Sequence, residues 1–299
     1  PAPGVFTFSA STITVGGQPQ SVRVVDVNQD ANLDIVIATG SGNEVVVAPN
    51  TTAAQAAVPT FATLVRVNVP NAADLSVVDI NQDNVPDIAS IDPIGNQVVI
   101  ALNQGGGAPG QAPIYNAPTN LSLSASPYFL EMGDLNRDNV PDLIVGSQAA
   151  DSLEVRFNTT GAGATTPSFS AATDLSAFVA VDDPSDVIIT DINQDTVPDI
   201  AFLNQGANEF VSLLNTTVAA AVTPTFGTPV SVTTDAGPVR LAEIFIDNDF
   251  YFTILFCKIF LKKNRNSQFI FFVGQDFINL KKILITFFSL SILEFFKIL

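Results

Sequence analysis

Short apolar runs rich in Val and Ile recur along residues 1–243 and are separated by turns rich in Gly, Asn and Asp. Runs of this length, bounded by turn residues, are typical of β-strands. No segment before residue 243 has a convincing helical period. The runs fall into groups of four, as in SVRVVD, LDIVIAT, EVVVAPN and the run that begins near Phe61. The pattern therefore predicts an all-β chain built from repeated groups of four strands.

The same unit is repeated along the chain. Four near-copies of one nine-residue loop, numbered one to four, start 53, 55 and 57 residues apart: DVNQDANLD (26–34), DINQDNVPD (79–87), DLNRDNVPD (134–142) and DINQDTVPD (191–199). Two other features keep this period, namely an aromatic residue (Phe8, Phe61, Tyr115, Phe169, Phe226) and an Asn that closes an apolar run (Asn50, Asn103, Asn158, Asn215). Four strands in about 50 residues is the size of one β-propeller blade. We therefore expect a partial propeller with four complete blades and a broken fifth.

Each loop places side-chain oxygens at positions 1, 3, 5 and 9, and we expect a backbone carbonyl at position 7 to add a ligand. The predicted metal ligands are Asp26, Asn28, Asp30, Asn32 and Asp34; Asp79, Asn81, Asp83, Val85 and Asp87; Asp134, Asn136, Asp138, Val140 and Asp142; and Asp191, Asn193, Asp195, Val197 and Asp199. Calcium prefers six to eight oxygen ligands, and an all-oxygen set favours it over zinc. The sequence thus predicts about four Ca²⁺ sites, one per repeat, with Mg²⁺ as a weaker alternative.

The sequence argues against two other interpretations of the loops, namely simple solvated turns and EF-hands. Solvated turns also contain Asp and Asn, but four loops with identical ligand positions argue against simple turns. An EF-hand needs Glu at position 12 and flanking helices, whereas position 12 here is Ile37, Ser90, Val145 or Phe202, within predicted strands. The net charge is also consistent with cation binding, because residues 1–243 hold 25 acidic and five basic residues. Bound cations would relieve the repulsion among the twelve loop carboxylates.

The loops, the PD-[IL] strand that follows three of them and the period of about 54 residues resemble FG-GAP/VCBS repeats, the blades of integrin-α-like β-propellers. The resemblance covers about residues 5–243 and implies Ca²⁺ at positions 1, 3, 5, 7 and 9. That family often has Gly at position 6, whereas this chain has Ala31, Asn84, Asn139 and Thr196. Asn tolerates a left-handed backbone better than Ala or Thr, so we expect loops one and four to be weaker sites.

Residues 244–299 differ from the rest of the chain. They hold all six Lys and 13 of the 23 Phe, and they carry four acidic residues against seven basic ones. A fifth loop begins at Glu243, but Phe245 stands where Asn is expected. This tail is interpreted as a membrane anchor, as a hydrophobic packing segment or as the product of a frameshift. The coincidence of the broken loop with the change in composition favours the frameshift.

The absence of His and the single cysteine, Cys257, argue against catalysis, so we expect no enzyme. The net charge of −17 argues against nucleic-acid binding. We expect an extracellular or cell-surface protein that uses a calcium-rigidified propeller for adhesion or recognition of a protein or glycan ligand. A membrane is a partner only if the tail is genuine. The alternatives are a lectin-like propeller, disfavoured by the absence of Trp, and an accessory module of a larger secreted enzyme.

Overall fold

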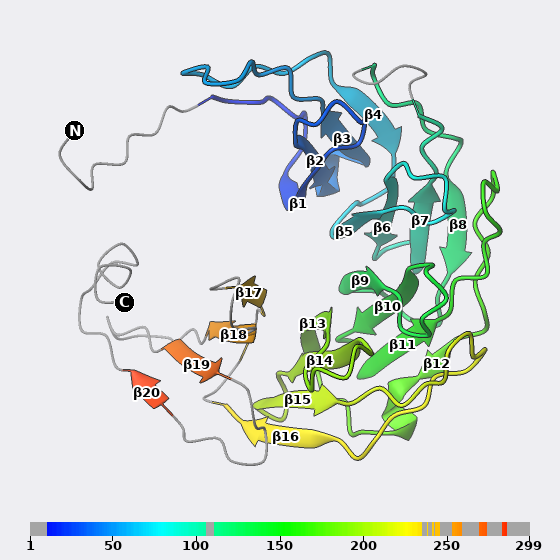
Figure 1. The fold of residues 1–299 in the computed structure, drawn as a ribbon, viewed down its shortest axis with the longest axis vertical. Coiled ribbons are helices and arrows are strands. Elements are labelled where there is room, and N and C mark those ends of the chain that lie inside the picture. The colour runs from blue at the N-terminus through cyan, green and yellow to red at the C-terminus, as the bar shows by residue number, and fades with distance from the viewer. Residues whose placement is uncertain are drawn as a thin grey trace. The chain divides into compact units, whose positions relative to one another are not determined.

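The structure is a computed structural model that describes residues 11–105 and 111–234, together with Pro238, Leu241 and four strands between residues 243 and 285. The described strands form five four-stranded antiparallel sheets, and each sheet takes four consecutive strands of the chain (Figure 1). This up-and-down meander is the topology of a propeller blade. The fold class predicted from the sequence, an all-β partial propeller of four-stranded blades, is therefore confirmed.

The strand bounds of the first four sheets follow the repeat. Sheet one contains β1 (Pro19–Val25), β2 (Asp34–Thr39), β3 (Glu44–Ala48) and β4 (Val65–Asn68). Sheet two contains β5 (Leu75–Val78), β6 (Asp87–Asp92), β7 (Gln97–Ala101) and β8 (Thr119–Ser122). Sheet three contains β9 (Phe129–Gly133), β10 (Asp142–Ser147), β11 (Ser152–Arg156) and β12 (Thr173–Asp174). Sheet four contains β13 (Pro184–Thr190), β14 (Asp199–Asn204), β15 (Glu209–Leu213) and β16 (Val230–Thr233).

The fifth sheet contains β17 (Glu243–Phe245), β18 (Thr253–Lys258), β19 (Phe269–Val273) and β20 (Ile283–Ile285). Its strands pair in chain order like those of the other sheets. The change in composition at residue 243 thus falls at the start of this sheet, and the remainder of the fifth loop lies outside the described residues. Two short 3₁₀ turns, η1 (Gly40–Gly42) and η2 (Leu175–Ala177), are the helical elements among the described residues, and no described helix is long and apolar enough to cross a membrane.

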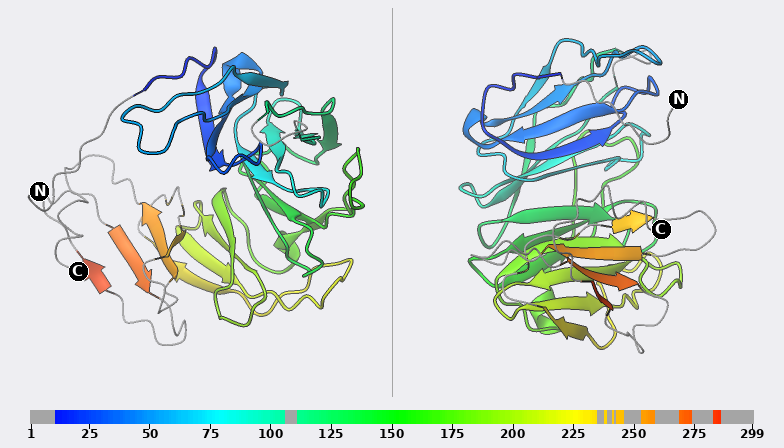
Figure 2. Two further views of the ribbon diagram at one scale, coloured as in Figure 1. Left: turned by 45° about the horizontal axis from the view of Figure 1, so that its top comes forward. Right: turned by 90° about the vertical axis from the view of Figure 1, so that its left-hand side faces the viewer.

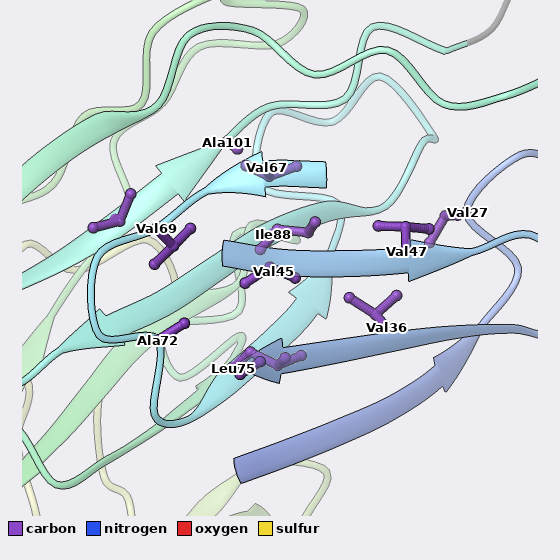
Figure 3. Close-up of a cluster of buried hydrophobic side chains, with 12 residues drawn as sticks. Val27, Val36, Val45, Val47, Val67, Val69, Ala72, Leu75, Ile88 and Ala101 are labelled. Carbon is purple, nitrogen blue, oxygen red and sulfur yellow. The ribbon is translucent and has the colours of Figure 1, made fainter. Parts of the chain in front are cut away.

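The chain divides into two compact units, and each has its own core. Unit 1 comprises Pro1–Leu130 and Asn158–Phe169, and unit 2 comprises Glu131–Phe157 and Ser170–Leu299. In unit 1, alternate residues of sheet one, such as Val36, Val45 and Val47, pack with Leu75 and Ile88 of sheet two (Figure 3). Because side chains alternate between the two faces of a strand, these positions share one face and bury it.

In unit 2, Ala201, Leu203 and Phe210 form a buried cluster with Ile188 and Val232 alongside them. These residues come from four neighbouring strands, β13 to β16, whose antiparallel meander can be followed in both views of Figure 2 in yellow-green and yellow. Buried apolar side chains of the strands thus form the core of each unit. The Asp and Asn residues at loop positions 1, 3 and 5 lie in the loops that connect these strands.

The fourth strand of each blade begins later than the sequence predicts. We expected it to start at the aromatic residue of each repeat, but the aromatics form isolated antiparallel bridges: Asn50 with Phe61, Asn103 with Tyr115, Asn158 with Phe169 and Asn215 with Phe226. The fourth strands start at Val65, Thr119, Thr173 and Val230. The Asn and the aromatic residue therefore pair across a separate loop after the third strand. This loop is called the arm of its repeat, so that arm three is residues 159–168 and arm four is residues 216–225.

Candidate metal centre

Every loop joins the first and second strands of its blade, and the residue at position 9 is the first residue of the second strand. Strands β2, β6, β10 and β14 begin at Asp34, Asp87, Asp142 and Asp199. An apolar residue follows each loop within the second strand, namely Ile35, Ile88, Leu143 or Ile200. The nine loop residues therefore have to turn back within a short distance, and hydrogen bonds to their own side chains make this turn possible.

Loop two shows how the turn is made. The backbone N–H of Asp83 donates to Asp79 Oδ1 at 3.1 Å and to Asn81 Oδ1 at 3.2 Å. The N–H of Asn84 donates to Asp79 Oδ2 at 2.7 Å, and that of Val85 donates to Asp83 Oδ1 at 2.9 Å. Because one N–H serves both Asp79 and Asn81, the oxygens of positions 1 and 3 are held next to each other. The position 5 carboxylate lies on the same turn.

The other three loops repeat these bonds at the same positions. The position 5 N–H is shared between positions 1 and 3 in loop one (Asp30 to Asp26 and Asn28), loop three (Asp138 to Asp134 and Asn136) and loop four (Asp195 to Asp191 and Asn193). The position 7 N–H donates to the position 5 carboxylate at Asn32, Val140 and Val197. Four independent copies of one bonding pattern indicate that the ligand positions are set by the sequence motif.

The backbone is left-handed at two positions of every loop. At position 6, φ is 67° for Ala31 and for Asn84, 66° for Asn139 and 70° for Thr196. This agrees with the conformation inferred from the Gly that the resembling family often has there. At position 4, φ is also positive, at 59°, 55°, 57° and 63° for Gln29, Gln82, Arg137 and Gln194. Sequence reasoning missed position 4, because Gln and Arg carry no signal for a left-handed residue.

The difference between Asn and Thr at position 6 gives a test of this strain. Thr196 and Asn84 are both exposed, so a swap at either position changes the backbone preference and little else. We expect Thr196→Asn to raise the free energy of unfolding by about 1 kcal/mol and Asn84→Thr to lower it by a similar amount. Urea denaturation in the presence of a chelator measures both without a contribution from bound cation. A shift in the same direction for both variants would contradict the argument from φ.

The position 9 carboxylates are fully buried, with 0% exposure for Asp34, Asp87, Asp142 and Asp199. Asp87 accepts the N–H of Ile80 at 2.8 Å on one oxygen and that of Asn103 at 2.6 Å on the other. Asp34 and Asp199 accept the equivalent pairs of N–H groups. Position 9, predicted as a ligand, thus also serves as the hydrogen-bonding centre that joins its loop to the end of the third strand.

Burial and neighbouring charge raise the pKa of three of these carboxyl groups, Asp34, Asp87 and Asp199. Burial raises the pKa of Asp87 to about 7 and that of Asp199 to about 6, and the carboxylates at positions 5 and 1 of the same loop add to the rise. The pKa of Asp34 is raised for the same reasons. The backbone N–H bonds act in the opposite direction. Each loop is therefore a site of concentrated negative charge, and a cation at the loop would offset the repulsion.

The oxygens at positions 1, 3 and 5 fit a hard cation in type and charge. No Lys or Arg side chain in the described part of the chain pairs with the carboxylates at positions 1 and 5. The nearest basic residue in sequence, Arg137, donates instead to the carbonyl of Thr217 at 3.0 Å. Three acidic side chains do not converge in a ready-made metal cluster among the described residues. Positions 1, 3 and 5 are thus brought together on each turn, while position 9 is directed to backbone donors.

The Asn at the end of the third strand is a structural residue that the sequence did not reveal. Asn215 Nδ2 donates to the carbonyls of Leu135 in loop three, at 2.7 Å, and Pro198 in loop four, at 2.8 Å. Asn103 makes the equivalent bonds to Val27 and Pro86. The regular spacing of this Asn could be seen in the sequence. Its hydrogen bonds to two consecutive loops could be seen only in the structure.

Comparisons with known proteins bear on the repeat. Residues 79–145, which hold loops two and three, match the family model described as FG-GAP-like repeat. A search of curated proteins finds no match. Among solved structures, the chain is similar to BBS1N in complex with ARL6DN (9% identity, 87% of this chain and 84% of that chain, TM-score 0.43). It is also similar to the Chaetomium thermophilum Nup170 NTD in its Nup53 complex (12% identity, 85% of this chain and 40% of that chain, TM-score 0.48).

The family match covers two of the four loops directly. Loops one and four share with them the position 5 N–H bonds and the left-handed backbone at positions 4 and 6. Loops one and four, which lie outside the matched residues, therefore have the same geometry as loops two and three. Residues 79–145 of the chain thus match the FG-GAP-like repeat.

Proposed function

We propose that the four loops bind Ca²⁺ and that the bound ions stiffen a propeller scaffold that recognises protein ligands outside the cell. The observation that carries the proposal is the repeated turn, in which the oxygens of positions 1, 3 and 5 are held together without a basic partner among the described residues. Calcium suits this donor set, because it is a hard cation that accepts carboxylate, amide and carbonyl oxygens in flexible geometry.

The proposed ligands in loop two are Asp79, Asn81 and Asp83, with the carbonyl of Val85 and the carboxylate of Asp87 completing the set. The other loops offer the same positions. A bound cation supplies the positive charge that each loop lacks. The chain's own residues keep the turn closed before and after binding, because the N–H bonds to positions 1, 3 and 5 do not depend on the ion.

An extracellular role follows from the strength expected of such sites. Calcium sites of extracellular modules bind the ion at roughly 10⁻⁴–10⁻³ M, which suits the millimolar calcium outside cells. Apolar residues of sheets one and two pack together, and those of sheet four form a cluster of their own, whereas the connecting loops stay at the surface and are available to a protein ligand. We propose a non-catalytic recognition module for these reasons.

Calorimetric titration of the full chain tests the calcium proposal. Calcium added to chelator-treated protein is expected to fill about four sites, and the double variant Asp79→Ala/Asp83→Ala is expected to fill one fewer, because it removes two of the loop two carboxylates. The matched control is Asp182→Asn/Asp183→Asn, which removes two carboxylates outside the loops and should keep the full stoichiometry. Absence of binding, or equal binding of Mg²⁺, would contradict the proposal.

A further inference from the structure

The arms of repeats three and four each contact the loop of the preceding repeat. Arm three is residues 159–168 and arm four is residues 216–225. Each is closed at its base by a backbone bond, from Thr159 N–H to the Ser168 carbonyl and from Thr216 N–H to the Thr225 carbonyl, both at 2.8 Å. The two ends of each arm are therefore held together at the same point of the repeat.

Arm three contacts loop two through a pair of hydrogen bonds. The N–H of Gly163 donates to the carbonyl of Asn81 at 2.7 Å, and Asn81 Nδ2 donates to the carbonyl of Ala164 at 3.0 Å. Both bonds involve the residue at position 3 of the loop. The arm belongs to repeat three, and the loop belongs to repeat two.

Arm four makes the same pair of bonds to loop three. The N–H of Ala220 donates to the carbonyl of Asn136 at 2.7 Å, and Asn136 Nδ2 donates to the carbonyl of Ala221 at 3.2 Å. Ala220 and Gly163 occupy equivalent positions and share a left-handed backbone, with φ of 56° and 66°. Arg137 adds its bond to Thr217, also in arm four. The contact is thus a repeated feature rather than a single accident of packing.

The division of the chain into units supports this assignment independently. Segment Asn158–Phe169, which contains arm three, groups with unit 1, the unit that holds loop two. Strands β11 and β12, on either side of the segment, belong to unit 2. Arm three therefore groups with the part of the chain that holds loop two.

The arm also fixes which way the position 3 amide faces. Asn81 Nδ2 donates to the arm and to Asp83 Oδ2 at 3.0 Å, while Asn81 Oδ1 accepts the N–H of Asp83. Asn136 is held in the same way by Asp138. An Asp at position 3 would offer an oxygen to the loop, but it would have no N–H for the arm carbonyl. The arm carbonyls thus give a reason for Asn rather than Asp at position 3 of loops two and three.

We infer that Asn81 and Asn136 are positioning residues that make each of these cation sites a two-repeat structure, closed by the arm of the following repeat. The inference rests on the proposed binding of Ca²⁺ to the loops. An ion in loop two then immobilises arm three, and an ion in loop three immobilises arm four. Calcium would thereby connect consecutive blades as well as stiffen the turn within one blade.

Hydrogen exchange of the full chain, with Ca²⁺ and with chelator, tests the inference by a crossed design. Calcium is expected to slow exchange in both arms by about tenfold or more. Asp79→Ala/Asp83→Ala should abolish this effect in arm three and leave it in arm four. Asp134→Ala/Asp138→Ala should do the reverse, so each double variant is the matched control of the other. An arm that responds to the loop of its own repeat, or to neither loop, would overturn the inference.

The variant Asn81→Asp separates the role of the arm from cation binding itself. It keeps an oxygen at position 3 and removes the N–H donors of the amide. We expect calcium still to slow exchange within residues 79–87 but no longer to slow exchange in arm three, with Asn136→Asp giving the same result for arm four. An arm three response equal to that of the parent chain would overturn the positioning role. If calcium slows exchange in no loop of the parent chain, the proposed function fails as well; if the loops respond and the arms do not, the inference alone fails.

Discussion

Removal of calcium is expected to lower the melting temperature of the full chain by about 10 °C or more. Binding to the folded state alone contributes RT ln(1 + [L]/Kd), which is about 1.4 kcal/mol per site at a free calcium concentration ten times Kd and about 6 kcal/mol for four equal sites. For a domain of this size, about 1 kcal/mol corresponds to roughly 2–4 °C. Thermal unfolding followed by circular dichroism, with millimolar Ca²⁺ and with chelator, measures the difference.

The control for this experiment has to separate specific binding from general screening of charge. Residues 1–243 hold 25 acidic and five basic residues, so any salt reduces their mutual repulsion to some extent. Magnesium chloride at the same ionic strength screens equally, and we expect it to recover only a small part of the calcium effect. An equal rise in melting temperature with magnesium would mean that the loops are solvated acidic turns. This is the interpretation that the four identical sets of ligand positions argue against.

The repeated blade and its loop could be predicted from the sequence because both depend on local signals. Val36 and Val47 lie in short apolar runs bounded by turn residues, and Asp and Asn at alternate loop positions mark a turn that hydrogen-bonds to its own side chains. The left-handed residue at position 6 was predicted at Asn84 from the Gly common at that position. Such features need only a few neighbouring residues, and a repeat shows them several times.

The features that escaped prediction join residues far apart in the chain. Asn103 was recognised as periodic, but its bonds to Val27 and to the carboxylate of Asp87 connect segments that only the folded sheet brings together. The arms escaped for the same reason, since Gly163 and Asn81 belong to different repeats. The fourth strand was placed too early, because Phe61 looks like the first residue of a strand but pairs alone with Asn50. Local propensity cannot distinguish a single bridge from the start of a ladder.

The residue with the largest expected effect on the cation-free fold is Asp87. Replacement of Asp87 by Ala leaves the N–H groups of Ile80 and Asn103 in a buried place without their acceptor. Each unsatisfied buried group costs about 1–3 kcal/mol. We therefore expect Asp87→Ala to lower the free energy of unfolding by about 3–4 kcal/mol, measured by urea denaturation in chelator.

Asp83→Ala is the matched control, because it removes a carboxylate of the same loop at a partly exposed position. Its bonds to Val85 N–H and Asn81 Nδ2 lie where water can replace them, so in chelator we expect a loss of about 1 kcal/mol or less. In calcium, Asp83→Ala should lose more, since it then also loses the stability conferred by the ion in loop two. Equal losses for the two variants in chelator would contradict the role of Asp87 as the buried acceptor for Ile80 and Asn103. A larger loss for Asp87→Ala would show instead that the same carboxylate joins the loop to the strand whether or not an ion is bound.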